Sequence, residues 1–471
     1  MHVSIPRRVG AIAAALSLAV LLAGSTAYAG QRDSSDDHGD GASQGPLIFG
    51  HRGAAGYRPE HTLASYDLAI RMGADVIEPD LVSTKDGVLV ARHENEIGGT
   101  TDVADHPEFA DRKATKTIDG VAITGWFTED FTFAELETLR AKERLPDVRQ
   151  ENTAYNGRYQ VPTFQQVIDL AKRASKAYGR PIGIAPETKH PTYFDSIGLS
   201  LEEKVVQTLR RNGLDNRGSG VYLQSFEEAN LRELRNRFHL KVHLVQLTGA
   251  TGQPYDHVAS GDPETYAQMT TPAGLKEMST YADVLGPDKA QIFPRDAAGN
   301  TGAPTTLVAD AHDAGLKVVP YTFRAENQFL PVQYRSSADP NAFGDLFAEI
   351  TDYFEVGVDG LFTDQSDIGF ATREDFLGHR TASSTPKPRP QPELRRQAPV
   401  ALIAAPLSGL QVPPRVRAPP VRVDHATWGS WTSPQVMAPR VHVDQATLGI
   451  METGDSRRVR AAPCNKIPTS A

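Results

Sequence analysis

Short apolar runs alternate with helical patterns through most of the chain, and this alternation constrains the fold more than any other feature of the sequence. The first run, Leu47–Gly50, ends abruptly in polar residues, and other runs are separated by patterns such as 163–177. Strands that alternate with helices are typical of a parallel α/β sheet. We interpret nine runs as strands: 47–50, 75–81, 88–92, 182–185, 221–223, 242–246, 284–286, 318–321 and 360–362.

Two histidines, an arginine and a pair of carboxylates stand in or after the first three runs. His51 and Arg52 follow the first run, and His93 follows the third. Glu78 and Asp80 are two residues apart in the second run, so on a strand they project the same way, a few ångströms apart. Neighbouring carboxylates repel each other unless a cation or a shared proton lies between them, which favours a hard-metal site. Without further context, a solvated strand face explains this pair as well.

The segment 51–95 resembles the opening of the glycerophosphodiester phosphodiesterase family. The resemblance covers roughly residues 47–370 and is closest to the secreted or periplasmic branch, which carries an insertion that corresponds here to 98–160. Glu94 and His61 depart from the pattern, since many members have Asp and Asn there, and we assign neither a chemical role. Further matching motifs follow in order: VPTF at 161–164, IAPETK at 184–189, YLQSF at 222–226, PYT at 320–322 and GVDGLFTD at 357–364.

The resemblance implies a TIM (β/α)8 barrel with a small insertion. Such a barrel needs eight strands, so one of the nine candidates is expected to be wrong or peripheral. In a TIM barrel, polar residues at the C-terminal ends of the strands form the active site at one face. The residues that end the apolar runs are therefore expected to converge.

Glu78, Asp80 and Glu187 are the metal ligands that this reasoning predicts, around one divalent cation. Three carboxylates suit Mg²⁺ or Ca²⁺, and the absence of thiolates and of a histidine pair from this trio argues against zinc. The resemblance to the extracytoplasmic branch favours Ca²⁺ over Mg²⁺.

Arg52 and Lys189 are expected to bind the phosphate. Hydrolysis of a phosphodiester builds negative charge on its oxygens, which preplaced cations stabilise. Arg52 offers a planar fork for two oxygens, and Lys189 supplies a point charge. His51 and His93 are the expected general acid and base, and the sequence does not say which is which.

Three more residues are expected to support the site. Glu60 is predicted to hold Arg52 or His51. Gln224 and Phe226, at the end of another strand, either line the substrate pocket or pack in the core.

The resemblance implies metal-dependent hydrolysis of small glycerophosphodiesters to sn-glycerol 3-phosphate and an alcohol. The nucleophile is either water or the substrate's own glycerol 2-hydroxyl, which would give a cyclic phosphate first. Alternatives are a phospholipase D or sphingomyelinase D-like enzyme, a teichoic-acid phosphodiesterase, and a surface-binding protein without catalysis. The polar character of the insertion favours a soluble substrate over a lipid. No nucleic-acid partner is expected, and the oligomeric state is open.

The two ends of the chain differ from the barrel region in composition. Residues 1–29 have the layout of a secretory signal peptide, with paired arginines, an apolar run and Ala-Tyr-Ala before Gly30, so export is expected. Residues 30–46 are predicted to be a flexible linker between this peptide and a catalytic domain at 47–370. Residues 380–471 are basic and rich in proline, which indicates a disordered tail, either passive or weakly attracted to anionic wall polymers or lipid. The single cysteine, Cys464, excludes an intramolecular disulfide.

Overall fold

Residues 45–384 are described by the computed structural model. The predicted signal peptide, nearly all of the predicted linker and the predicted tail beyond residue 384 lie outside the described residues, so these interpretations stay predictions. Within 45–384, none of the helices combines the length and the apolar character that a membrane span requires.

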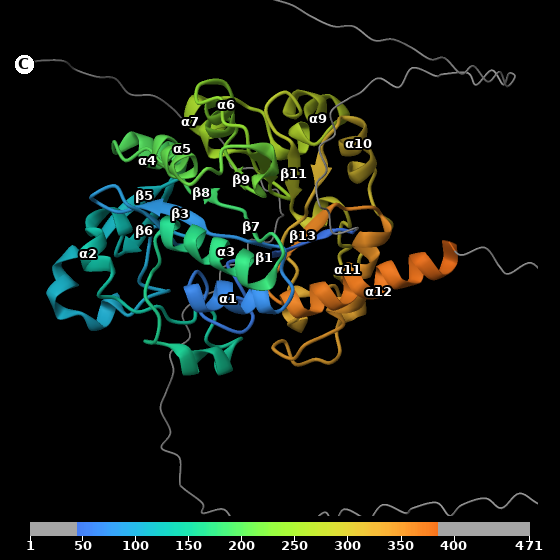
Figure 1. The fold of residues 1–471 in the computed structure, drawn as a ribbon, viewed down its shortest axis with the longest axis horizontal. Helices are drawn as coiled ribbons and strands as arrows, with labels where there is room; N and C mark the ends of the chain where they lie inside the picture. Colours follow the sequence, from blue (N-terminus) through green and yellow to red (C-terminus); the bar gives the residue numbers. More distant parts are fainter. Residues whose placement is uncertain (1–44, 385–471) are drawn as a thin grey trace, which may run out of the picture. The chain divides into compact units, whose positions relative to one another are not determined.

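Eight parallel strand positions close into a barrel in this part of the chain (Figure 1). Hydrogen-bonded neighbours run in the orders β13-β1-β2-β7 and β12-β11-β10-β9-β8-β3, and parallel bridges from Ile184 to Val221 and from Phe323 to Thr363 join the two series. Two positions are each filled by a pair of short strands, β2 with β3 and β7 with β8. The barrel strands are β1 (Leu47–Gly50), β2 (Val76–Ile77), β3 (Asp80–Ser83), β7 (Gly183–Ile184), β8 (Glu187–Thr188), β9 (Tyr222–Ser225), β10 (His243–Thr248), β11 (Val284–Pro287), β12 (Lys317–Val318) and β13 (Gly360–Thr363).

Proline explains why two strand positions are interrupted. Pro79 lies between β2 and β3, and Pro186 lies between β7 and β8. Because proline has no backbone N–H, the ladder loses one donor at each point. Both proline carbonyls still accept: Glu187 N donates to Pro79 O at 3.1 Å, and Gln224 N donates to Pro186 O at 2.9 Å. The barrel therefore continues across both interruptions.

One of the nine predicted strands, 88–92, is peripheral, as expected for a barrel that needs eight. It is β4 (Leu89–Ala91), which pairs antiparallel with β3 through a turn at 84–88. Gly87 has a φ of +80° in this turn, a conformation that glycine adopts without strain. The hairpin returns the chain toward the C-terminal end of the barrel, where it places His93.

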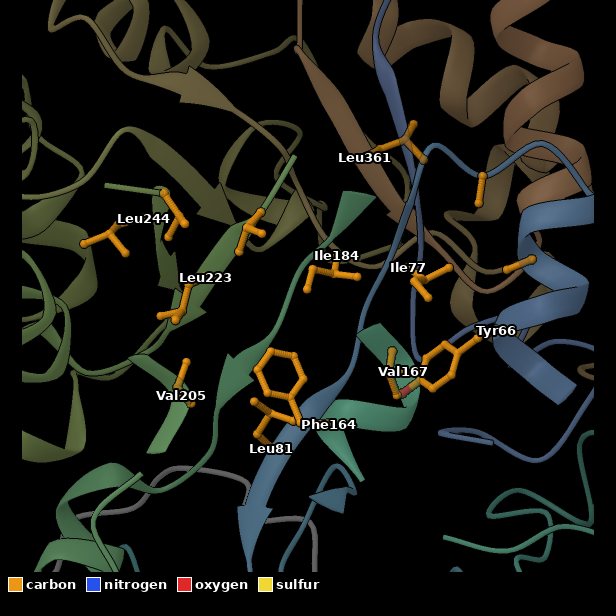
Figure 2. Packing of buried hydrophobic residues seen from close by; sticks show 14 of the residues in the cluster. Tyr66, Ile77, Leu81, Phe164, Val167, Ile184, Val205, Leu223, Leu244 and Leu361 are labelled. Atoms are coloured by element: carbon orange, nitrogen blue, oxygen red, sulfur yellow. The ribbon is translucent and has the colours of Figure 1, made fainter. Parts of the chain in front are cut away.

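Side chains of the barrel strands alternate between two apolar layers. A small interior cluster holds residues such as Phe49, Val76 and Phe362. Their neighbours in sequence, among them Ile77 and Leu361, point outward into the larger layer beneath the helices (Figure 2). This alternation is what a strand period of two residues requires of a closed barrel.

Helices cover the outside of the barrel, and their ends follow the sequence signals. Thr62 caps α1 by accepting from Ser65 N, and Gly73, with a φ of +96°, follows its end. Thr163 forms a capping box with Gln166 at the start of α3. The helices are α1 (Leu63–Arg71), α3 (Phe164–Tyr178), α4 (Pro191–Ser196), α5 (Glu202–Arg211), α6 (Glu228–Asn236), α7 (Tyr255–Ser260), α8 (Tyr266–Met269), α9 (Pro272–Met278), α10 (Leu307–Asp313), α11 (Leu346–Glu355) and α12 (Ser366–Ser384), with 3-10 turns at η5 (Arg217–Ser219), η6 (Lys289–Gln291), η7 (Asn327–Phe329) and η8 (Val332–Tyr334).

The insertion at 98–160 folds against the barrel near β3 and β4, as Figure 1 shows in cyan. Its buried residues Phe127, Phe131 and Leu136 are fully or almost fully excluded from solvent, and the last two belong to the outer core layer. Its elements are η1 (Val103–Asp105), η2 (Pro107–Arg112), the hairpin of β5 (Ala114–Ile118) and β6 (Val121–Gly125), η3 (Thr128–Asp130), α2 (Phe133–Leu136) and η4 (Gln150–Tyr155).

Candidate active site

Polar side chains lie on the interior face of the barrel, two residues further along each strand than the side chains of the apolar layer. Phe49 belongs to the interior cluster, and His51 follows two residues later; Ala185 is followed in the same way by Glu187 and Lys189. Since residues two apart share a face of a strand, the polar groups lie directly above the apolar layer at the C-terminal ends of the strands. The same step leads from Val76 to Glu78 and Asp80, from Tyr222 to Gln224 and Phe226, and from Phe362 to Asp364.

Glu78, Asp80 and Glu187 form a buried carboxylate cluster. Each offers an oxygen within 4.8 Å of the others, and none is more than 5% exposed. Burial and the two neighbouring carboxylates raise the pKa of Glu78 well above its usual range, and burial raises that of Glu187 to about 7 despite the nearby Lys189. Asp80 Oδ1 is buried without a hydrogen-bond partner. An all-oxygen cluster with an unpartnered oxygen fits a hard divalent cation such as Ca²⁺ or Mg²⁺.

Neighbouring groups hold the remaining oxygens of this cluster. Gln224 Nε2 donates to Glu78 Oε1 at 2.7 Å, which places Gln224 in the site rather than in the apolar core. Lys189 Nζ lies 2.9 Å from Glu187 Oε1. Burial would raise the pKa of Asp80, but the charge and hydrogen bond of His61 hold it below its usual range.

His61 is fully buried and contacts a predicted metal ligand, so the expectation that it stays outside the chemistry is not supported. Its Nε2 donates to Asp80 Oδ2 at 3.0 Å, and its Nδ1 accepts from Tyr66 OH at 2.8 Å. Both ring nitrogens are therefore used. His61 fixes the orientation of Asp80 through a contact that the sequence pattern alone did not reveal.

His51 is held by a carboxylate from the opposite end of the barrel sequence. Its Nδ1 donates to Asp364 Oδ1 at 2.5 Å, and its Nε2 faces Thr322 Oγ1 at 3.5 Å. Burial and the charge of Arg52 lower the pKa of His51 to about 4 against the opposing effect of Asp364. The imidazole is therefore neutral at pH 7, with the Nδ1 proton directed at Asp364 and Nε2 left as an acceptor.

Two arginines fix the carboxylate of Asp364. Arg149 from the insertion donates to Asp364 Oδ2 at 2.6 Å, and Arg324 donates to the same oxygen at 3.0 Å. Burial would raise the pKa of Asp364, but these guanidinium groups hold it well below its usual range. Arg149 also donates to Glu326 at 2.6 Å, so the arginine itself is anchored.

His93 has a carboxylate partner as well. Its Nδ1 lies 2.8 Å from Glu94 Oε1, and its Nε2 lies 3.4 Å from Lys189 Nζ. Burial, together with the charges of Arg52 and Lys189, lowers the pKa of His93. Glu94 therefore contacts Nδ1 of His93 as Asp364 contacts Nδ1 of His51, and the sequence pattern did not reveal this contact. The expectation that Glu94 has no chemical role stays a prediction.

His190 connects Glu94 to the insertion. Its Nε2 donates to Glu94 Oε2 at 2.9 Å, and its Nδ1 donates to Asp119 Oδ2 at 2.6 Å. Burial opposes the charged form, but the hydrogen bonds to these two carboxylates raise the pKa of His190 to about 9. His190 thus links the β5–β6 turn, through Asp119, to Glu94 and so to His93.

Arg52 lies in a strained turn directly after β1. Its φ is +57°, which is uncommon for a residue with a side chain. Its backbone N donates to Glu78 Oε2 at 2.9 Å, and its Nη1 donates to Glu60 Oε2 at 3.2 Å, which confirms Glu60 as its partner. Arg52 Nε is buried with no hydrogen-bond acceptor. A buried donor of this kind is costly to leave unpaired, so it marks a position for a ligand oxygen.

One cavity of about 490 Å³ unites these groups at the C-terminal end of the barrel. His51, Arg52, Glu78, His93 and Glu187 line it. All seven residues selected from the sequence thus come together: five line this cavity, Lys189 contacts Glu187 and His93, and Asp80 completes the carboxylate cluster. Phe226 lines the wall of the cavity and also packs against both apolar layers, so it combines the two predicted alternatives.

Sequence reasoning missed Asp364, Arg149 and Arg324. Asp364 had a usable signal, because it stands two residues after Phe362 and therefore on the interior face of the last strand. Arg324 lies beyond the end of the predicted strand 318–321, where the two-residue alternation of a strand no longer predicts the direction of a side chain. Arg149 lies in an irregular part of the insertion, and nothing in its local sequence indicates a contact with residue 364.

Comparison with known proteins identifies the family of this chain. The model of the glycerophosphoryl diester phosphodiesterase family matches residues 51–368. A glycerophosphodiester phosphodiesterase of Arabidopsis thaliana is 38% identical over 336 residues, 68% of this chain and 83% of its own length. One of Haemophilus influenzae is 28% identical and covers 76% of this chain and 96% of its own length.

Among solved structures, an Oleispira antarctica phosphodiesterase in complex with the product sn-glycerol-3-phosphate is 17% identical, with a TM-score of 0.42, and the match covers 69% of this chain and 96% of that one. A glycerophosphodiester phosphodiesterase from Agrobacterium tumefaciens is 18% identical, with a TM-score of 0.43, and covers 69% and 99%. The family model and the relatives, rather than these distant structures, carry the conclusion: the chain is an enzyme that belongs to the glycerophosphodiester phosphodiesterase family.

Proposed function

We propose that this enzyme hydrolyses soluble glycerophosphodiesters to sn-glycerol 3-phosphate and an alcohol, with His51 and His93 as the general acid and base beside one divalent cation. The observation that carries the proposal is the shared cavity in which two carboxylate-oriented histidines face a buried three-carboxylate cluster. General acid-base catalysis needs side chains that take or give a proton within reach of the reacting atoms, and imidazole is the side chain that most often does this.

Arg52 and Lys189 supply the positive charge that a phosphodiester requires. Arg52 Nε has no hydrogen-bond acceptor among residues 45–384 and is available to a phosphate oxygen. Lys189 lies between Glu187 and His93, at 2.9 and 3.4 Å, so its ammonium stands beside both the carboxylate cluster and a candidate proton carrier. Fixed cations in a buried site stabilise the charge that develops on phosphate oxygens at little cost in reorganisation.

The two histidines are oriented to exchange protons through Nε2. Each directs Nδ1 to a carboxylate, which leaves Nε2 as the atom that takes or gives a proton. In the bond-breaking step the histidine that acts as base is neutral and accepts a proton from the attacking hydroxyl, while the other histidine starts the step protonated and gives its Nε2 proton to the oxygen of the departing alcohol. The first histidine is then protonated and the second neutral, and proton exchange with water restores the starting pair.

Glu78, Asp80 and Glu187 would hold the divalent cation, and the resemblance to exported family members favours Ca²⁺ ahead of Mg²⁺. When bound, such an ion neutralises part of the negative charge of the phosphate and of the carboxylates. The raised pKa values of Glu78 and Glu187 support this proposal, because three buried carboxylates without a counterion retain protons. The signal-peptide pattern at 1–29 supports export, where Ca²⁺ is abundant.

The experiment measures release of sn-glycerol 3-phosphate from glycerophosphocholine by the full-length chain. EDTA is expected to abolish release, and restored Ca²⁺ is expected to recover more of it than restored Mg²⁺. His51→Ala should lose turnover while retaining metal binding by calorimetry, whereas Asp80→Asn should weaken metal binding and recover partly at higher metal concentration. His379→Ala, which removes an imidazole with 80% exposure, is the matched control. Full activity in EDTA, or turnover by His51→Ala within twofold of the parent, would refute the proposal.

A further inference from the structure

A second cavity of about 390 Å³ lies beside the catalytic one and shares a wall with it. Glu187 and Phe226 line both cavities, and Lys189 lines the second. The remaining wall comes from the β5–β6 turn of the insertion at Asp119, from Glu227, and from Tyr255 and Tyr266 on α7 and α8. A phosphodiester has two organic arms, so a cavity that adjoins the phosphate-binding groups is placed to hold one of them.

Aromatic rings make up much of this second cavity. Phe226 and Tyr266 meet edge to face with 6.3 Å between their centroids. Tyr255 reaches the insertion turn, since a Cβ added to Gly120 would stand 3.7 Å from its ring. Aromatic faces attract cations through the ring quadrupole, most strongly where water is excluded.

Carboxyl oxygens in the cavity exceed the positive groups that could pair with them. Glu227 is only 3% exposed, and burial raises its pKa to about 8. Thr192 donates to Glu227 through its backbone N, at 3.2 Å, and through its hydroxyl. Asp119 Oδ1 is buried and accepts no hydrogen bond.

The two cations that line the cavity are already engaged. Lys189 pairs with Glu187 at 2.9 Å, and its ammonium also stands 5.7 Å from the Phe226 ring. His190 uses both ring nitrogens on Asp119 and Glu94. Asp119 Oδ1 therefore has no donor among the described residues, and Glu227 accepts hydrogen bonds from Thr192 but has no cationic partner there. A cation that entered from outside would meet these carboxyl oxygens and the aromatic faces together.

We propose that this cavity binds the alcohol arm of the diester and selects an alcohol that carries an ammonium group. The inference rests on the proposed function, since it assigns the second arm of that substrate. A cationic alcohol would contact Glu227, Asp119 and the rings of Tyr255 and Tyr266. A neutral alcohol such as glycerol gains neither the ion pair nor the cation–π contact.

The test compares kcat/KM of the full-length, metal-loaded enzyme for glycerophosphocholine, glycerophosphoethanolamine and glycerophosphoglycerol. We expect kcat/KM for the two cationic substrates to exceed kcat/KM for the neutral one by about tenfold. This factor corresponds to one favourable ionic or cation–π contact. Glu227→Gln and Tyr266→Leu should each reduce this ratio toward one, mainly by raising KM for the cationic substrates. Glu264→Gln, which changes a nearby acid that does not line the cavity, should keep the parental ratio.

The outcomes separate this inference from the proposed function. Equal kcat/KM for all three substrates, or a ratio that Glu227→Gln and Tyr266→Leu leave unchanged, would overturn the ammonium site while the hydrolase function stands. No turnover of any substrate by a folded, metal-loaded sample would overturn both. Asp119→Asn provides an independent variant on the insertion side, and it should also lower the ratio if the cavity is used as inferred.

Discussion

Replacement of His190 by glutamine tests whether a buried imidazolium ties the insertion to the active site. Asp119 and Glu94 raise the pKa of His190 to about 9, against 6.5 for an ordinary histidine. A group whose pKa is raised by folding stabilises the protein fully below its unfolded pKa and loses this contribution as the pH rises through the folded pKa. The difference of about 2.5 pKa units corresponds to about 3 kcal/mol at about 1.4 kcal/mol per unit.

We therefore expect His190→Gln to lower the free energy of unfolding by about 3 kcal/mol at pH 6 and to lose this deficit by about pH 9.5. Urea unfolding of both proteins at several pH values, followed by tryptophan fluorescence, gives the two curves. Glu227 and Glu187 titrate in the same window, so the informative quantity is the difference between variant and parent. His379→Gln should give a difference close to zero throughout. A His190→Gln deficit that stays constant from pH 6 to 9.5 would show that His190 is not held as a cation.

Two further predictions concern single residues. Asp364→Asn should lower kcat by about a hundredfold with little change in KM, because His51 loses the carboxylate that orients it. It should also cost about 3 kcal/mol of stability, because Arg324 loses its ion pair with Asp364 and the buried Arg149 keeps only Glu326. Steady-state kinetics that show a kcat within a factor of three of the parent would contradict the first expectation. Gly53→Ala should reduce the free energy of unfolding by at least about 2 kcal/mol, because the residue has a φ of +92° and a Cβ would meet backbone of α1 at 2.7 Å. Gly157 also has a positive φ, but a Cβ added there would meet nothing within 4 Å, so Gly157→Ala reports the backbone strain alone. Urea unfolding of both variants separates the two effects, and an equal decrease in the free energy of unfolding would rule out the clash at Gly53.

The regular parts of the barrel could be predicted from the sequence because they depend on local periods. Strand geometry alone places residues two apart on the same face, as it does for Phe49 and His51. The same rule correctly placed the carboxylate pair of Glu78 and Asp80 on one face, beyond Val76. The helix limits at Thr62 and Gly73 likewise depend on local capping chemistry.

The contacts that orient the candidate site residues could not be predicted in this way. His61 reaches Asp80 from a turn, with a φ of +52°, and no period describes such a residue. Arg149 reaches Asp364 across 215 positions of sequence from an irregular segment. Such pairs depend on how elements pack in three dimensions, and a single sequence carries no local signal for that.

The hydrogen bond between His51 and Asp364 joins the first and last strands of the barrel across 313 positions of sequence. Closing so long a segment lowers the entropy of the chain, and other native contacts must compensate for this loss before the contact forms. Turnover should therefore return late in refolding, after the helices and most of the secondary structure, and it would report the joining of β1 to β13. A chain cut anywhere between His93 and β13 would keep both candidate histidines in its first fragment, but that fragment would lack the carboxylate that orients His51.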